Sequence, residues 1–105
     1  MEEIKILNYL KRRHRGQSNA IKSPALEARF GISGRELREV VNELRCRGYP
    51  VCSDDSGYYY ASNEAELTAT IRQLNSRISK IAMARNGLVR AMETLADSGQ
   101  TRLPL

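Results

Sequence analysis

The sequence lacks the residues from which most catalytic and metal sites are built. The 105-residue chain has one histidine, His14, two cysteines, Cys46 and Cys52, and no tryptophan. Structural zinc sites usually need four Cys or His ligands in closely spaced pairs. Neither a glycine-rich phosphate loop nor a nucleophile with a neighbouring base is present. We therefore predict a protein that is not an enzyme, holds no metal or cofactor and has no small-molecule ligand.

Long hydrophobic runs are also missing. None approaches the roughly 18 residues that cross a bilayer. The acidic start at residues 1–4 lacks the basic and apolar regions of a signal peptide. A cytoplasmic protein without a membrane partner is the resulting expectation. In that compartment both thiols stay reduced, and we expect two half-buried cysteines and a solvated His14.

Basic residues are in modest excess over acidic ones. The chain has 17 Lys and Arg against 12 Asp and Glu, a formal net charge of +5. Hydrophobic residues make up 41% and charged residues 28%, which is typical of a globular protein. The basic excess favours a polyanionic partner but does not choose among DNA, RNA and anionic lipid.

Apolar periodicity and capping residues divide the first half of the chain into short elements. A first helix is expected over residues 3–13. Residues 14–19 form a polar loop, and 20–22 are a candidate strand. A second helix is expected from Ser23, its N-cap, to Phe30. The apolar stripe of the first helix is Ile4, Ile6, Leu7 and Leu10.

A capping box predicts the start of a third helix, over residues 34–47. The Ser33 hydroxyl can accept from the backbone of Glu36, whose carboxylate can reach back. Strands are then expected at 49–53 and 58–61, in a hairpin. The apolar face of the helix is Leu37, Val40, Val41 and Leu44.

The apolar residues of the second and third helices fall where a helix-turn-helix requires them. One position departs from the pattern, because Glu27 stands where a small residue usually lies between the helices. The acidic hairpin tip, Asp54 and Asp55, cannot grip phosphate, so we expect it not to enter the minor groove. The six residues of the expected type are Leu26, Phe30, Gly31, Ile32, Leu37 and Val40.

Residues 3–61 resemble a winged-helix DNA-binding domain of the kind found in the biotin repressor and similar bacterial regulators. Residues 32–51, ISGRELREVVNELRCRGYPV, resemble that family's recognition helix running into its wing. The hairpin that ends in Gly57-Tyr58-Tyr59, directly before a long helix, is similar to small winged-helix proteins of bacteriophages and prophages. The resemblance implies a double-stranded DNA partner.

In such a domain the third helix enters the major groove. At about 100° per residue its outward face holds Arg35, Glu39, Asn42 and Cys46. Arginine can pair with guanine, asparagine with adenine, and glutamate can accept from cytosine. The basic run 11–15 is either a further backbone contact or a solvated helix end favoured by the dipole. The predicted DNA contacts are Lys22, Ser23, Arg29, Ser33, Gly34, Arg35, Arg38, Glu39, Asn42 and Arg45.

A long helix follows, capped by Asn63 with Glu66 at the capping-box position, and it is expected to continue through Asn86–Gly87. Its apolar residues alternate in steps of four and three, the heptad pattern of a coiled coil, which only Arg85 interrupts. The helix spans about 50 Å, more than the preceding domain covers, so we expect a homodimer. The predicted interface is Leu67, Ile71, Leu74, Ile78, Ile81, Arg85, Leu88, Met92 and Leu95.

The orientation of the pair stays open. Two Arg85 side chains would face each other in a parallel pair, which favours an antiparallel one. Arg85 would then face Leu74, with Ile71 against Leu88 and Ile78 against Ile81. The alternative is that the stripe packs on its own N-terminal domain.

The predicted fold is mainly α with a small β-hairpin: a winged helix-turn-helix at 1–62, a long dimerisation helix at 63–97 and a flexible tail at 98–105. The predicted function is sequence-specific binding of double-stranded DNA by a nucleoid-associated homodimer, as a transcription regulator or a phage replication or control factor. The alternative is a protein-interaction adaptor, which the acidic wing and the glutamates of the third helix favour. RNA binding is a weaker third option, because no stacking-aromatic motif is present.

Overall fold

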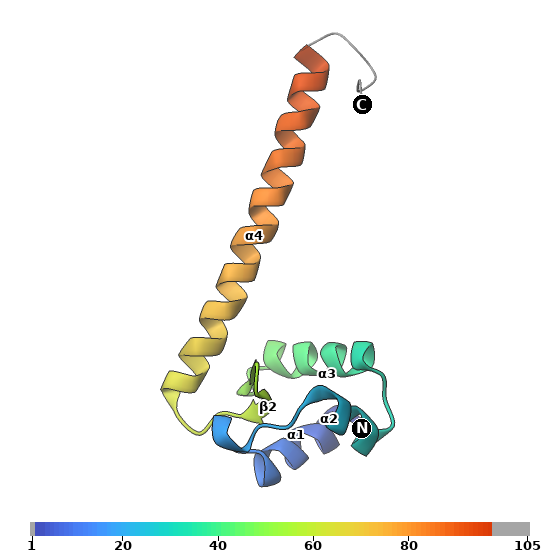
Figure 1. Ribbon diagram of the computed structural model, residues 1–105, viewed down its shortest axis with the longest axis vertical. Helices are drawn as coiled ribbons and strands as arrows, with labels where there is room; N and C mark the ends of the chain where they lie inside the picture. The colour runs from blue at the N-terminus through green and yellow to red at the C-terminus, as the bar shows by residue number, and fades with distance from the viewer. Residues whose placement is uncertain (1, 98–105) are drawn as a thin grey trace. The chain divides into compact units, whose positions relative to one another are not determined.

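The computed structural model describes residues 2–97 (Figure 1). The predicted fold class, mainly α with a small β-hairpin and a long C-terminal helix, is confirmed. The expected flexible tail, residues 98–105, lies outside the described residues. The elements are α1 (Glu2–Arg13), the 3-10 helix η1 (Gln17–Asn19), α2 (Ser23–Phe30), α3 (Gly34–Cys46), β1 (Val51–Asp54), β2 (Gly57–Tyr60) and α4 (Glu64–Asp97).

The chain divides into two compact units, residues 1–71 and 72–105. The first, here called the N-terminal unit, contains everything from α1 to β2 and also the first two turns of α4. The second contains the remainder of α4. The division falls later than residue 62, where the sequence placed the boundary.

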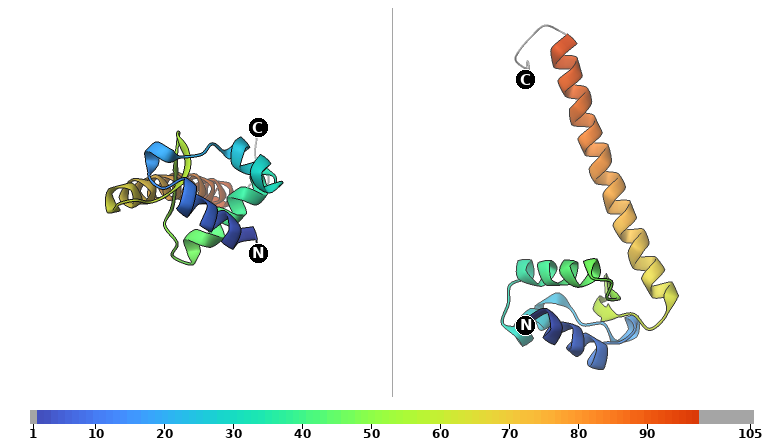
Figure 2. Two further views of the ribbon diagram at one scale, coloured as in Figure 1. Left: turned by 90° about the horizontal axis from the view of Figure 1, so that it is seen from below. Right: turned by 180° about the vertical axis from the view of Figure 1, so that it is seen from behind.

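The core of the N-terminal unit forms where α1, α2 and α3 pack together beside the hairpin (Figure 2). The apolar stripes predicted for α1 and α3 supply most of it, as the helical period requires. Val40 is half-buried at its edge. The buried members of this core are Ile6, Leu7, Leu10, Leu26, Leu37, Val41, Leu44 and Val51.

The turn between α2 and α3 accommodates the unusual Glu27. The Glu27 carboxylate accepts from the Ser23 hydroxyl at 2.7 Å. A Cβ added at Gly34 would lie only 3.2 Å from that carboxylate. Position 27 does not hold the expected small residue. The glycine at position 34, on the other helix, leaves room for the Glu27 carboxylate instead.

The start of α2 differs from the prediction. Lys22 is the N-cap, without a side-chain hydrogen bond, and Ser23 is the first helical residue. Ser23 was expected as the N-cap, but its hydroxyl donates to Glu27, one turn ahead, instead of accepting from the helix backbone. The end of α2 is as predicted: Gly31 is left-handed at φ 63°, and its N–H donates to the Glu27 carbonyl.

The hairpin pairs Val51 with Tyr60 and Asp54 with Gly57 in antiparallel register. The candidate strand at 20–22 is present as a single bridge, since Ile21 exchanges both backbone hydrogen bonds with Tyr58, at 2.8 and 2.9 Å. This bridge brings the Ile21 carbonyl directly against Gly57.

A second apolar cluster joins the hairpin to the start of α4. Cys52, Tyr59 and Ala61 are buried, and Leu67 packs against them. Burial raises the pKa of the Cys52 thiol, and it raises the pKa of Tyr59 to about 12. Both groups are therefore neutral at physiological pH and act as core residues. Leu67, which was predicted for the dimer stripe, lies within its own N-terminal unit.

Glu66 supplies the polar part of the same junction. The Asn63 side chain accepts from the Glu66 N–H at 2.9 Å, so the predicted cap is confirmed. The Glu66 carboxylate does not return to Asn63. It accepts from the N–H groups of Ser62 at 2.8 Å and Gln17 at 2.9 Å. These backbone hydrogen bonds, first that of Ser62, lower the pKa of Glu66.

Three predictions about single side chains are wrong. Cys46 is exposed and Cys52 is buried, where two half-buried cysteines were expected. His14 is not solvated. It is half-buried, its Nδ1 lies 2.7 Å from the Asn19 carbonyl oxygen, and its ring centroid lies 5.1 Å from that of Tyr9. The loop after α1 folds back and covers the ring.

Helix α4 runs without interruption through Asn86–Gly87, as predicted. A search of residues 2–97 finds no helix that is both long and apolar enough to cross a membrane.

Replacing Gly57 with alanine should destabilise the fold severely. The new Cβ would lie 2.2 Å from the Ile21 carbonyl oxygen, at a backbone φ of 121°. We expect a loss of about 3 kcal/mol, combining backbone strain with overpacking. Gly48→Ala is the matched control, because Gly48 also has positive φ, at 91°, with nothing within 4 Å. That variant should lose about 1 kcal/mol. Equal losses in urea unfolding would contradict the role of the Ile21 bridge.

Glu66→Gln should weaken the junction in a pH-dependent way. The folded-state pKa of Glu66 lies below its ordinary value of 4.5. Its stabilisation is therefore complete above about pH 4.5 and is lost as the pH falls through the folded pKa. The difference in unfolding free energy between wild type and Glu66→Gln should shrink over that interval. Glu64→Gln, an exposed first-turn carboxylate, is the control for the helix dipole. A difference that stays constant from pH 7 to 3 would refute the assignment.

Candidate nucleic-acid interface

The side of α3 that faces away from the core is polar and exposed. Leu37, Val41 and Leu44 are buried on one side of this helix. The exposed residues on the opposite side are Arg35, Arg38, Glu39, Asn42 and Cys46. The predicted outward face of the third helix therefore corresponds to the observed one, and we call these five residues the α3 face.

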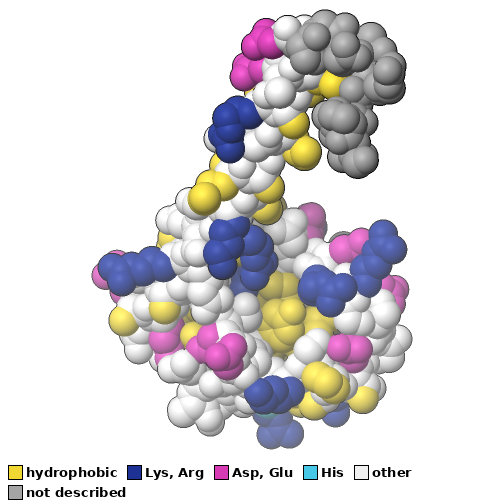
Figure 3. All heavy atoms as spheres, turned by 45° about the horizontal axis from the view of Figure 1, so that its top comes forward, with side chains coloured by type: hydrophobic (Ala, Val, Ile, Leu, Met, Phe, Trp, Pro, Cys, Tyr) yellow, Lys and Arg dark blue, Asp and Glu magenta, His cyan; other side chains and the backbone are white. Residues whose placement is uncertain are grey.

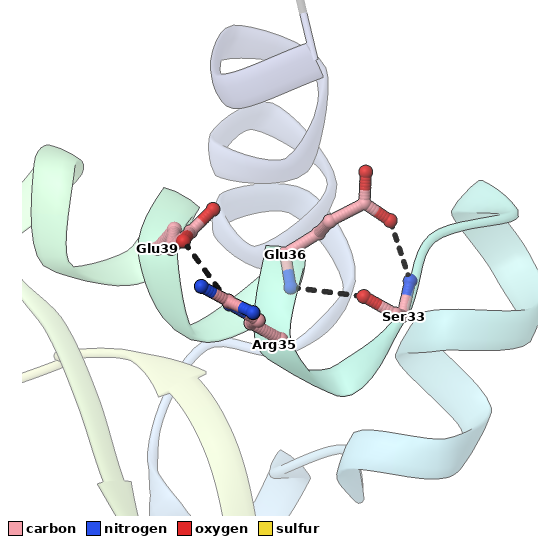
Figure 4. A network of polar contacts seen from close by, with 4 residues as sticks. All are labelled: Ser33, Arg35, Glu36 and Glu39. Carbon is pink, nitrogen blue, oxygen red and sulfur yellow. Dashed lines mark hydrogen bonds and ion pairs between the residues drawn. The ribbon is translucent and has the colours of Figure 1, made fainter.

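The start of α3 is fixed by the predicted capping box (Figure 4). The Glu36 N–H donates to the Ser33 hydroxyl at 3.1 Å, and the Ser33 N–H donates to the Glu36 carboxylate at 2.9 Å. Within residues 2–97, the backbone N–H groups of Gly34 and Arg35 have no acceptor. Two backbone donors thus remain at the positive end of the helix dipole, an arrangement that suits a phosphate.

Arg35 and Glu39 form an ion pair on the α3 face. Arg35 Nε lies 3.7 Å from Glu39 Oε2 (Figure 4), and the two side chains are 84% and 68% exposed. Exposed pairs of this kind stabilise little, about 0 to 1 kcal/mol. Arg35 can therefore exchange Glu39 for another acceptor at low energetic cost.

The two edges of the α3 face carry opposite charge. Arg38 lies on the α2 side, where its guanidinium and the Glu27 carboxylate both approach Gly34. On the α1 side, Glu36, Glu39 and Glu43 line a shallow groove together with Val40 and with Glu3 of α1. An anion would be attracted to the first edge and repelled from the second.

Arg45 does not join the α3 face, although the sequence assigned it to DNA contact. Its guanidinium donates to the Val51 carbonyl at 2.8 Å and to the Ser53 hydroxyl at 3.0 Å, and the side chain is half-buried. These hydrogen bonds fasten the end of α3 to β1. Arg45 is a structural residue here.

Three of the predicted DNA contacts, Lys22, Ser23 and Arg29, lie on or just before α2 and interact with residues outside the α3 face. Lys22 donates its ammonium to the Asp55 carbonyl at the hairpin turn. Ser23 donates to Glu27. The Arg29 guanidinium lies 4.7 Å from the Tyr9 ring centroid, in a cation–π contact with α1. Only the exposed Lys22 and Arg29 carry charge that an anion could recruit.

The hairpin turn is acidic, and its Asp54 side chain is held by hydrogen bonds within the N-terminal unit. One Asp54 oxygen accepts from the Ser56 N–H at 2.7 Å, and the other accepts from the Gln17 amide. With Asp55 exposed beside it, the tip offers carboxylates rather than cations to its surroundings.

One basic cluster becomes visible only in the structure. Lys11 and Arg15 lie 5.9 and 5.5 Å from the centroid of the same ring, that of Tyr60. The sequence signalled the basic run at 11–15. It gave no indication of Tyr60, because only the fold brings β2 to this helix end, where Tyr60 pairs with Arg15.

Apolar side chains are exposed along α4 (Figure 3). In the single chain the exposed part of its apolar stripe begins at Ile71. Leu74 and Leu95 are half-buried, and Arg85 is exposed with its guanidinium donating to Asn86. The large side chains with more than half of their surface exposed are Ile71, Ile78, Ile81, Met83, Leu88 and Met92. All except Met83 belong to the predicted stripe.

Comparison with known proteins finds no matching protein family, no matching curated protein and no matching solved structure. Within residues 2–97 no three His, Cys, Asp or Glu side chains are grouped closely enough to hold a metal ion.

Proposed function

We propose that the protein is a homodimer that binds double-stranded DNA in a sequence-specific manner, with α3 in the major groove. The observation that carries the proposal is the α3 face: its polar side chains are exposed, and the core does not use them. The resemblance of residues 3–61 to winged-helix domains supports the same reading. A transcription regulator, or a phage replication or control factor, would act in this way.

Four residues of the α3 face have a chemical role in this proposal. Arg38 and Arg35 offer paired donors that suit the acceptors of guanine. Asn42 offers one donor and one acceptor, which suits adenine, and Glu39 can accept from cytosine. The free N–H groups of Gly34 and Arg35 would hold a phosphate at the groove edge.

The opposite charges at the two edges predict how the duplex approaches. Glu36 and Glu43 would repel phosphates on the α1 side. We therefore expect the closest backbone contacts on the α2 side, near Arg38, with Lys22 as a further contact. The acidic hairpin tip would stay outside the minor groove.

Two copies would pair through the stripe of α4. Its exposed isoleucines and leucines recur at heptad spacing, and burying one large aliphatic side chain contributes about 1.5 to 3 kcal/mol. One small module makes few base contacts, whereas two linked modules gain through effective concentration. Dimerisation thus supports binding to a site with two half-sites.

Arg38→Ala and Asn42→Ala should each weaken binding to the preferred duplex by about 10-fold to 100-fold and relax the choice of base at one position. The preferred duplex would first be obtained by selection from a random pool, and affinities measured by gel shift. Lys5→Ala on α1 removes the same charge from an exposed position outside the α3 face and should bind like wild type.

Unchanged affinity in both α3 variants would eliminate this helix as the reader. Failure of the wild type to bind any duplex at 50 mM salt would overturn the proposed function. The acidic groove between α1 and α3 would then favour the adaptor alternative, with a basic protein as the partner to seek.

Ile78→Glu should convert the dimer to a monomer, because it places an unpaired charge in the middle of the apolar stripe. Sedimentation equilibrium would measure the change, which we expect to exceed 100-fold in the dimer dissociation constant. The matched control is Met83→Glu, which changes a residue of similar exposure outside the stripe and should leave the dimer intact. Equal effects at the two positions would argue against a coiled coil through this stripe.

A further inference from the structure

The net positive charge of the chain lies mostly outside the N-terminal unit. Residues 1–71 contain eleven Lys and Arg against ten Asp and Glu, whereas residues 72–105 contain six against two. Between residues 72 and 92 there are five cations and no carboxylate. The segment that self-association requires is therefore also the most basic part of the protein.

Most of these cations lie away from the apolar stripe. At about 100° per residue, Arg72, Lys80 and Arg90 fall on the side of α4 opposite the stripe, and Arg77 falls beside it. All four are exposed. Arg77 and Lys80, with Gln73 and Ser76, line a shallow hollow on the helix surface. We call Arg72, Arg77, Lys80 and Arg90 the basic face of α4.

The basic face has no internal counter-charge. Within residues 2–97 the ion pairs are Arg35 with Glu39 and Arg47 with Glu43, both in the N-terminal unit. Solvent-exposed faces of paired helices usually alternate in sign and gain from pairs three or four residues apart. A face of a single sign has a cost in self-repulsion, which an anionic partner would offset.

We infer that the basic face of α4 binds the phosphate backbone of duplex DNA, as a sequence-independent contact separate from the α3 face. The inference rests on the proposed function and deepens it. In the dimer the stripes face each other, so the basic faces point outward and remain accessible. Each copy would neutralise about four phosphates.

Charge couples this contact to dimerisation. Pairing two copies of α4 brings ten cations together, and their repulsion is screened only beyond a Debye length of about 10 Å at 0.1 M salt. Without DNA, the dimer should therefore become tighter as salt is added. Bound phosphates remove the same repulsion, so duplex and dimer stabilise each other.

An anionic membrane is the other surface that a basic amphipathic helix can bind. Such helices insert Trp, Phe or Leu from the apolar face, and this chain has no aromatic residue after Tyr60. The leucines of α4 lie in the stripe that dimerisation would bury, which favours the nucleic acid.

The test is the variant Arg72→Gln, Arg77→Gln, Lys80→Gln, Arg90→Gln in the full chain, with binding to a random-sequence duplex followed by fluorescence anisotropy from 50 to 200 mM salt. For this Gln variant, the slope of log affinity against log salt should be less steep than the wild-type slope by about 3 to 4 per copy. Each neutralised phosphate contributes about 0.9 to that slope. The matched control exchanges the same four cations, Arg for Lys and Lys for Arg, and should keep the wild-type slope. Circular dichroism checks that α4 stays helical in both.

An unchanged slope in the Gln variant overturns this inference, and the proposed function stands if Arg38→Ala still relaxes base preference. A reduced slope supports it, even where α3 variants keep the wild-type base preference and the proposed readout fails. If wild type binds no duplex, vesicles of phosphatidylserine and phosphatidylcholine are tested. Vesicle binding that the Gln variant loses would assign the basic face to membranes and overturn the inference.

Discussion

The burial of Leu37, Val41 and Leu44 decides which side of α3 the protein offers to its surroundings. These side chains fit against α1, α2 and the hairpin, and the helical period then forces Arg35, Arg38 and Asn42 outward. The base readout proposed for α3 depends on this orientation. A rotation of α3 by one residue, about 100°, would bury charge and expose the core, so the orientation is strongly specified.

Some polar side chains near α3 bond within the fold, and others are exposed and available to a partner. Arg45 and Glu27 bear charge, yet both are used within the fold, one to fasten β1 and the other to close the contact between α2 and α3. Within residues 2–97, the side chains of Arg38 and Asn42 make no comparable hydrogen bond. The contrast separates residues that position α3 from residues that can recognise a partner.

The two units differ in how they use charge. The N-terminal unit is nearly neutral, and two of its cations, Arg35 and Arg47, pair with glutamates on the same helix. Such a surface suits recognition in which shape and hydrogen-bond pattern discriminate between partners. Between residues 72 and 92, α4 carries cations and no carboxylate, which suits attraction without sequence preference. Base readout and backbone attraction would thus be carried by different segments of one small chain, with Glu66 and Leu67 fixing the start of α4 to the N-terminal unit.

Local chemistry was sufficient to predict the helices, the caps at Ser33 and Asn63, the hairpin and the unbroken helix through Gly87. Helical period, the Ser33 capping box and the Asn63 cap act within a few residues of each other, so the sequence by itself determined them, as it did the net charge and the heptad spacing. Only the tertiary structure decided the partners of Arg45, Glu27, Leu67 and Glu66. Each of these contacts either joins residues from different elements or depends on how two elements cross, and neither composition nor periodicity contains that information.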